Sequence, residues 1–178
     1  MRQGFTLIEV MVAAAVLAVG CLGVLGMLMT SINHNREARD SSAAVTIAEQ
    51  ALYDLEIQAT DWETNKNITT STLGKVYQAS SNTPGQWQLL KVCNINGVPT
   101  GKPAHDRFAV GYYMLKPMSK TSSNDHIRGA IRVVWNNTKS SVNCLEASVF
   151  ANMDKFPTAQ KSCGSISIPF ALGPNIVH

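Results

Sequence analysis

MRQGFTLIEV, residues 1–10, begins a chain of 178 residues and decides how the rest of it folds. A short leader with one positive charge, Arg2, ends at Gly4, and the aromatic Phe5 follows directly. Residues 10–29 then contain no charged or strongly polar side chain. At about 1.5 Å per residue such a run forms a helix of roughly 30 Å, the thickness of a bilayer's hydrocarbon core. The sequence therefore predicts a helix able to span a membrane.

The positions of Gly4 and Glu9 distinguish this segment from an ordinary signal peptide or anchor. A secretory signal has an apolar region of about 7–15 residues and is cleaved after it, whereas Gly4 precedes the apolar run. Arg2, the only upstream charge, favours a cytoplasmic N-terminus. An unpaired carboxylate near the membrane core, such as Glu9, costs on the order of a few kcal/mol. Cleavage after Gly4 would give Phe5 a free amine, which could pair with Glu9 of a neighbouring subunit.

The stretch Gly4-Phe5-Thr6-Leu7-Ile8-Glu9 resembles the class III signal of type IV pilins and pseudopilins. This resemblance is close over residues 1–57 and extends beyond them only in general layout. It implies that a prepilin peptidase cleaves between Gly4 and Phe5, that Phe5 becomes methylated, and that Glu9 forms the assembly salt bridge. It also implies a single pass of the inner membrane with a cytoplasmic N-terminus, followed by a place in the pilus fibre or at its tip.

A polar section follows the apolar run and carries a helical pattern of its own. Its apolar residues recur three and four positions apart, at Ala44, Ile47, Ala48, Ala51, Leu52 and Leu55. This spacing is typical of one buried face of an amphipathic helix. We therefore expect a leader at 1–4, one long helix at 5–57 and a globular head at 58–178. Residues 5–32 form the membrane or filament part of the helix, and residues 33–57 its amphipathic part.

The sequence of the head predicts mainly antiparallel strands. Alternating patterns predict strands at 86–94, 107–116, 127–135 and 142–151. Residues 60–83 are predicted to be a surface loop with at most short structure, and residues 152–178 a loop region. In the third strand Ile131, Val133 and Trp135 share one face with Ile127, and Arg128 and Arg132 lie on the other, which we expect to be solvated. Such strands with one buried face would pack on the 44–55 stripe. The expected fold is α+β, with a long N-terminal helix on an antiparallel sheet, which is also the type IV pilin fold.

The cysteines leave several pairings open. Cys21 lies in the apolar run and is expected to be a small buried hydrophobe, whereas Cys93, Cys144 and Cys163 lie in the head. Three cysteines allow one disulfide, and the sequence does not choose among three pairings. The C-terminal disulfide loop of many pilins, which this layout resembles, favours Cys144 with Cys163. Cys93 would then be free and buried, or would pair with another subunit.

Catalytic and nucleic-acid-binding signals are weak. The chain lacks the familiar hydrolase, zinc-protease and phosphate-binding motifs, so we expect no enzyme, no cofactor and no metal. His105, His126, Cys93 and Cys144 follow no known ligand spacing. Charged residues make up 15% of the chain and the net charge is +3, which does not indicate DNA binding.

The kind of pilin is suggested by two further stretches. Residues 18–27, with glycines every third position, and residues 48–55 resemble V-type (PilV-type) minor pilins, also called type IV pilus modification proteins. The resemblance implies a structural subunit that primes a pilus tip, with other minor pilins, the major pilin and in many cases a tip adhesin as partners. Three alternatives remain: a type II secretion pseudopilin, a competence pseudopilin, and a single-pass anchored domain that never assembles.

Overall fold

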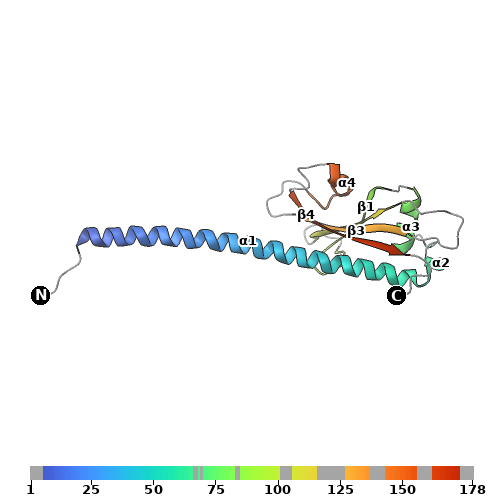
Figure 1. Ribbon diagram of the computed structural model, residues 1–178, viewed down its shortest axis with the longest axis horizontal. Coiled ribbons are helices and arrows are strands. Elements are labelled where there is room, and N and C mark those ends of the chain that lie inside the picture. The colour runs from blue at the N-terminus through green and yellow to red at the C-terminus, as the bar shows by residue number, and fades with distance from the viewer. Residues whose placement is uncertain are drawn as a thin grey trace. The chain divides into compact units, whose positions relative to one another are not determined.

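The computed structural model describes residues 6–65, 68, 70–82, 85–100, 106–115, 127–136, 143–155 and 162–172 (Figure 1). The chain divides into two compact units, Met1–Arg39 and Asp40–His178. Helix α1, Leu7–Ala59, contributes to both of them.

The first unit consists of the apolar part of α1. This helix has 53 residues and contains a stretch long and apolar enough to cross a membrane. No residue of that stretch is buried by the rest of the chain. Large side chains such as Leu7, Val16 and Leu25 are therefore exposed around the helix, as expected of a segment whose surroundings are lipid or other helices. The helix ends two residues beyond the expected 57.

The second unit contains a four-stranded antiparallel sheet in the order β1-β2-β3-β4. The strands are β1 (Trp87–Cys93), β2 (Phe108–Met114), β3 (Ile127–Asn136) and β4 (Cys163–Leu172). Trp135 of β3 lies opposite Phe108 on one side and Gly164 on the other. A long N-terminal helix and an antiparallel sheet confirm the expected α+β class and agree with the type IV pilin fold.

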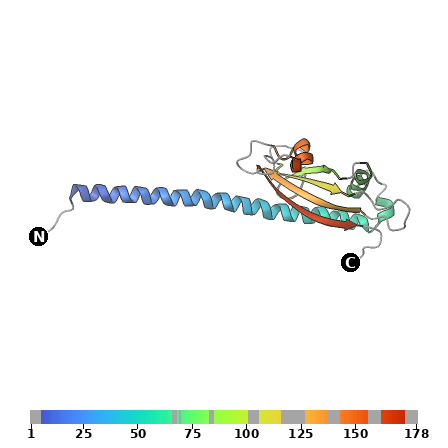
Figure 2. The ribbon, with the colours of Figure 1, turned by 45° about the horizontal axis from the view of Figure 1, so that its top comes forward.

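One face of the sheet packs on the second half of α1, from which it buries Ala44, Ile47, Ala48, Ala51 and Leu55 (Figure 2). The predicted apolar stripe is thus confirmed. An ion pair of 3.0 Å joins Asp40, which is only 6% exposed, to Arg107 just before β2. Gly97, with φ of 76°, lets the turn after β1 approach Gln50 of α1 closely.

The other face of the sheet is also covered, which the sequence did not predict. Helix α4 (Ala147–Asn152) and the 3-10 turn η1 (Met153–Lys155) lie over it (Figure 2). Phe150 and Met153 from this cover are buried with Trp87 and Val134 of the sheet. The ring of Phe150 lies so close to Gly111 that any side chain there would collide with it. The second unit therefore has three layers.

The strand predicted at 142–151 is wrong. Residues 143–146 form a turn, and α4 follows. Phe150 and Met153, three apart, are the fully buried residues; of the expected alternating set, Leu145 and Val149 are only partly buried and Ala147 is exposed. Over so short an apolar stretch, the two-residue period of a strand and the 3.6-residue period of a helix are hard to distinguish.

The loop predicted at 152–178 is also wrong, because it contains β4. Ile166, Ile168 and Phe170 alternate there with exposed residues, and Pro169 obscured the pattern. Strand β4 lies at the edge of the sheet and has one neighbouring strand, β3. A proline is tolerated in an edge strand because the side without a neighbour requires no hydrogen bond from its backbone nitrogen.

The loop predicted at 60–83 holds two helices, α2 (Trp62–Asn65) and α3 (Thr72–Asn82). Leu73 and Val76 of α3 are buried in the core formed with α1. Burial of these two side chains stabilises a helix whose polar composition predicts none.

Candidate functional site

The assembly residues predicted from the sequence lie at the start of α1. Gly4 and Phe5 fall outside the described residues. Glu9 lies in the first helical turn and is exposed. There its negative charge is stabilised by the helix dipole.

Thr6 and Glu9 make a side-chain contact at the start of α1 that the sequence analysis did not predict. Thr6 immediately precedes α1, and its hydroxyl donates to Oε2 of Glu9 at 3.5 Å. Its carbonyl accepts from the amides of Glu9 and Val10, at 3.1 and 3.3 Å. The spacing Thr-x-x-Glu is the signature of a capping box and was visible in the sequence. The Glu9 carboxylate thus has a contact within its own chain, besides any role between subunits.

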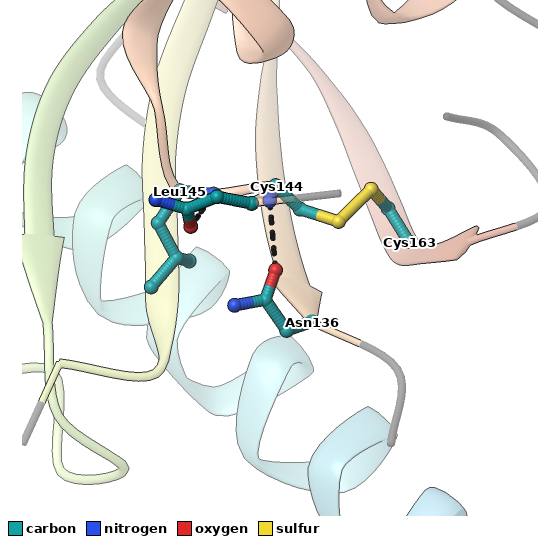
Figure 3. The surroundings of a disulfide bond; sticks show 5 residues. Asn136, Cys144, Leu145 and Cys163 are labelled. Atoms are coloured by element: carbon teal, nitrogen blue, oxygen red, sulfur yellow. Dashed lines mark hydrogen bonds between the residues drawn. A yellow bond between two sulfur atoms is a disulfide. The ribbon is translucent and has the colours of Figure 1, made fainter. Parts of the chain in front are cut away.

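A disulfide joins Cys144, in the turn before α4, to Cys163 at the start of β4 (Figure 3). The two Cα atoms are 5.9 Å apart and the residues are 19 positions apart in the sequence. Oδ1 of Asn136, at the end of β3, accepts a 2.7 Å hydrogen bond from the amide of Cys144. Both contacts fix the segment that covers the second face of the sheet. The joined pair is the one that the resemblance favoured.

Arg132 does not lie on a solvated face, so that expectation is wrong. Its side chain is only 13% exposed, and its guanidinium lies 3.7 Å from the centre of the Trp87 ring. Nη2 is 2.9 Å from Oδ1 of Asp154, whose other oxygen accepts from Nε1 of Trp87 at 2.8 Å. Nε donates to Ser167 at 3.3 Å. Arg128, four residues earlier on β3, is exposed, as expected.

The cluster of Trp87, Arg132 and Asp154 is structural in character. Nη1 of Arg132 is buried and has no hydrogen-bond partner among the residues that the structure describes. A guanidinium stacked on an indole gains a cation–π interaction, which offsets a missing hydrogen bond. Because that nitrogen is inaccessible, no ligand reaches it in this conformation. Nothing in the sequence predicted the cluster, since its members come from β1, β3 and η1 and share no local pattern.

Cys93 is free and buried against α1, and Cys21 is free and exposed on the apolar part of the helix. Burial of the Cys93 thiol raises its pKa to about 11; the nearby Lys91 partly opposes this and Asp106 adds to it. Burial of Tyr112 likewise raises the pKa of its phenol, with a further contribution from Asp54. A thiol inside the core is not available to another subunit, so the alternative of an intermolecular disulfide through Cys93 is unsupported.

The described residues contain no group of three histidine, cysteine or acidic side chains that could hold a metal ion. His105 and His126 lie outside them, and Cys144 is engaged in the disulfide.

One family model matches the chain: residues 1–30 match the prokaryotic N-terminal methylation motif. No curated protein and no solved structure matches the chain. The matched motif is the prepilin signal of type IV pilin-like proteins, which have a structural and not an enzymatic role. Proteins that carry this signal are processed by a prepilin peptidase and assemble with other pilins.

Proposed function

We propose that this protein is a type IV pilin-like filament subunit, and that it is a minor pilin. The observation that carries the proposal is the methylation motif at 1–30, placed at the start of an unburied apolar helix that carries Glu9 in its first turn. An α+β head follows that helix, as in the pilin fold. The motif accounts for the leader, and assembly accounts for an apolar surface that the chain itself does not cover.

The proposed mechanism has three steps. The chain enters the inner membrane with its N-terminus in the cytoplasm, and the peptidase cuts between Gly4 and Phe5 and methylates the new amine of Phe5. Glu9 then pairs with the Phe5 amine of a neighbouring subunit. Leaving the bilayer, the apolar helices bury one another, which stabilises the bundle by roughly 25 cal/mol per Å² of apolar surface removed from water.

The finer assignment, a minor pilin that primes the pilus tip, rests on the likeness of residues 18–27 and 48–55 to V-type minor pilins. Its partners would be other minor pilins, the major pilin and a tip adhesin. The three-layered head, closed by its own disulfide, would present the surface that these partners contact.

The experiment that tests the general proposal is the intact mass of the protein from its native host. Loss of residues 1–4 together with the gain of one methyl group on Phe5 is the expected result. An uncut N-terminus would contradict the proposal and would make the chain a single-pass anchored domain.

The same motif also serves pseudopilins of type II secretion and of competence systems. Immunogold labelling of sheared surface fibres separates these cases. A minor pilin is expected in the fibres, at low abundance and near their ends. Labelling confined to the cell envelope would favour a secretion pseudopilin.

A further inference from the structure

Strand β4, the last strand of the sheet, has a free outer edge (Figure 2). It is ten residues long and pairs only with β3, so one row of its backbone amides and carbonyls has no partner strand among the described residues. The strand, Cys163–Leu172, contains no charged side chain. Sheet edges are commonly protected by charged residues, bulges or a covering element. A long edge without a charge is a template on which another strand can pair.

The hydrogen-bond pattern identifies the backbone groups that point outward from β4. The amide of Leu115 donates to the carbonyl of Arg128 at 2.9 Å, so Arg128 directs its backbone groups towards β2 and away from β4. Ala171 lies opposite Arg128 in the register of β3 and β4. In an antiparallel ladder, a pair that exchanges no hydrogen bonds directs its backbone groups away from each other, and such pairs alternate with bonded ones. The outward-facing residues of β4 are therefore Ser165, Ser167, Pro169 and Ala171.

Pro169 agrees with this assignment, because a proline that faced β3 would break a bond of the ladder. It removes one donor from the outer edge and leaves the outward amides of Ser165, Ser167 and Ala171. The opposite edge of the sheet, β1, is better protected. It has a bulge next to Lys91, and the helix α4 packs against it. The structure thus leaves β4 as the edge that is open to a partner.

The two faces of β4 indicate what kind of strand would fit beside it. Ile166 and Ile168 face the core shared with α1 but are only partly buried. A neighbouring strand with apolar side chains on that face would complete their burial. On the opposite face, the outward-facing residues of β4 are small and exposed, so they leave room for larger side chains of a partner.

Arg128 supplies a charge for the same contact. Its side chain is exposed on the face of the small outward residues, and it makes no ion pair with any residue that the structure describes. A strand added beside β4 would lie two strand spacings from β3, or about 10 Å. Long side chains that lean towards each other bridge that separation, and the small Ala171 between them does not obstruct it. An acidic residue on the partner strand would therefore reach Arg128.

We propose that β4 binds an extended segment of a different filament subunit, which joins the sheet as an additional strand. This rests on the proposed function, because assembly brings another subunit to the head. The segment has apolar residues on the side of Ile166 and Ile168, and on its other side an acidic residue that pairs with Arg128. Backbone hydrogen bonds supply affinity, and the alternating side chains supply specificity.

A second copy of this chain fits the edge less well than a different subunit. Strand β4 itself has no acidic residue that could pair with Arg128 of another copy. Antiparallel pairing of two β4 strands about a twofold axis would also reverse the direction of one head relative to the other. Two chains inserted in one membrane in the same orientation do not meet in that way. A minor subunit, moreover, rarely has a copy of itself as neighbour.

Proline substitution tests the edge in the native host, with the full chain measured in sheared filaments. Ser165→Pro/Ala171→Pro removes two outward amides and no bond to β3, and is expected to lower incorporation about tenfold or more. Ala147→Pro is the matched control, because Ala147 is the first residue of α4, where proline is well tolerated. A double variant that melts within about 3 °C of the wild type is folded. Normal incorporation of that variant would overturn the proposal.

Hydrogen exchange measures the edge without any substitution. In the isolated full chain in detergent, the outward amides of Ser165, Ser167 and Ala171 are expected to exchange quickly, and the inward amides of Ile166 and Ile168 slowly. In filaments the outward amides should exchange about tenfold more slowly or less. Equal exchange in the two samples would overturn the proposal. Slow exchange of the outward amides in the isolated chain would also overturn it, because the edge would then be covered already.

Cross-linking combined with charge reversal identifies the partner. A photo-reactive benzoylphenylalanine at position 165 should form an adduct, in filaments, with a segment of another subunit that contains an acidic residue. Arg128→Glu is expected to lower incorporation about fivefold or more, and replacing the mapped acid by arginine should restore it to within about threefold of the wild type. Lys75→Glu, at an exposed position on α3, is the control and should have no effect. An adduct with a second copy of this chain, or no rescue, would overturn the proposal.

The outcomes separate this proposal from the proposed function. A wild-type chain that is processed but absent from filaments contradicts the proposed function, and the strand addition with it. A wild-type chain that enters filaments together with the folded proline variant and Arg128→Glu contradicts only the strand addition.

Discussion

Asp154 binds Arg132 across the second face of the sheet, with 2.9 Å between Oδ1 of the carboxylate and Nη2 of the guanidinium. Its Oδ2 accepts from Nε1 of Trp87 at 2.8 Å, and the same guanidinium stacks on that indole. One carboxylate in the disulfide-bounded segment thus connects that segment to strands β1 and β3. The cover over the second face is held by polar contacts as well as by Phe150 and Met153.

Asp154→Ala should loosen this cover. It removes two hydrogen bonds and leaves the charge of Arg132 without its acid, but Asp154 is 54% exposed, which reduces the effect. We expect a loss of about 1 kcal/mol in the free energy of unfolding, or roughly 3 °C in melting temperature. Thermal unfolding of the full chain in detergent measures it. Lys155→Ala, at the next and exposed position, is the matched control, and equal melting temperatures would contradict the prediction.

Gly111→Ala should displace Phe150. The new Cβ would collide with the Phe150 ring and with the carbonyl of Gln88. Overpacking of this kind costs about 1–3 kcal/mol, which urea unfolding would report. Gly23→Ala, whose Cβ meets nothing within 4 Å, serves as the control.

A compensating change sharpens the same test. Phe150→Leu removes the ring that blocks the new methyl group, so Gly111→Ala should cost less in that background than in the wild type. Equal costs in both backgrounds would show that the close approach of Phe150 does not constrain position 111.

Reducing the disulfide should destabilise the head. The bond closes a loop over a separation of 19 residues, and loss of that constraint on the unfolded chain costs about 3 kcal/mol. We expect a reductant to lower the urea midpoint and to shift the tryptophan emission of the chain to the red, because the cover over Trp87 loosens. In Cys144→Ala/Cys163→Ala the reductant should have no effect; a reductant effect that persists there would refute the assignment.

Cys93 should make stability fall in alkaline solution. Burial raises its pKa from 9.0 to about 11, so the folded state favours the neutral thiol. Its contribution is fully present below pH 9, where the thiol is protonated in both states, and is lost as pH rises towards 11. The loss is about 2–3 kcal/mol. The free energies of unfolding of the wild type and of Cys93→Ala should therefore depend on pH in parallel from pH 7 to 8.5. Above pH 9 the wild type should lose stability that the variant does not lose. Curves that stay parallel to pH 11 would contradict the prediction.

Local periodicity predicted the parts of this fold whose burial repeats along the chain. The stripe from Ala44 to Leu55 and the first three strands were visible for that reason. Strand β4 was missed because Pro169 argued against a strand, and only its edge position makes that proline acceptable. An edge position is a property of the sheet and not of the segment.

The same holds for the candidate site, where contacts between residues close in the sequence could be predicted and contacts between distant residues could not. Glu9 and Thr6 lie three residues apart, so their relation can be read from the sequence by spacing alone. Arg132 was misjudged because the residues that bury it, Trp87 and Asp154, are distant in the sequence. An arginine that alternates with apolar residues on a strand looks solvated until the element above it is known.

Glu9→Ala and Glu9→Gln should both leave processing intact and lower incorporation into filaments by about tenfold or more. The reason is that pairing with the Phe5 amine of a neighbour requires a negative charge, which neither variant has. If the role of Glu9 were only to cap α1 with Thr6, Gln would substitute for it, since glutamine also completes a capping box. Incorporation and intact mass are measured together in the native host.

Thr6→Ala completes this comparison. It removes the hydroxyl that donates to Glu9 but keeps the charge, so incorporation should remain within about threefold of the wild type. Normal incorporation of Glu9→Gln together with loss in Thr6→Ala would reverse the assignment and make the helix cap the important function of the pair. Loss in both Glu9 variants with Thr6→Ala near normal separates the charge from the cap, because only the charge differs between glutamate and glutamine at this position.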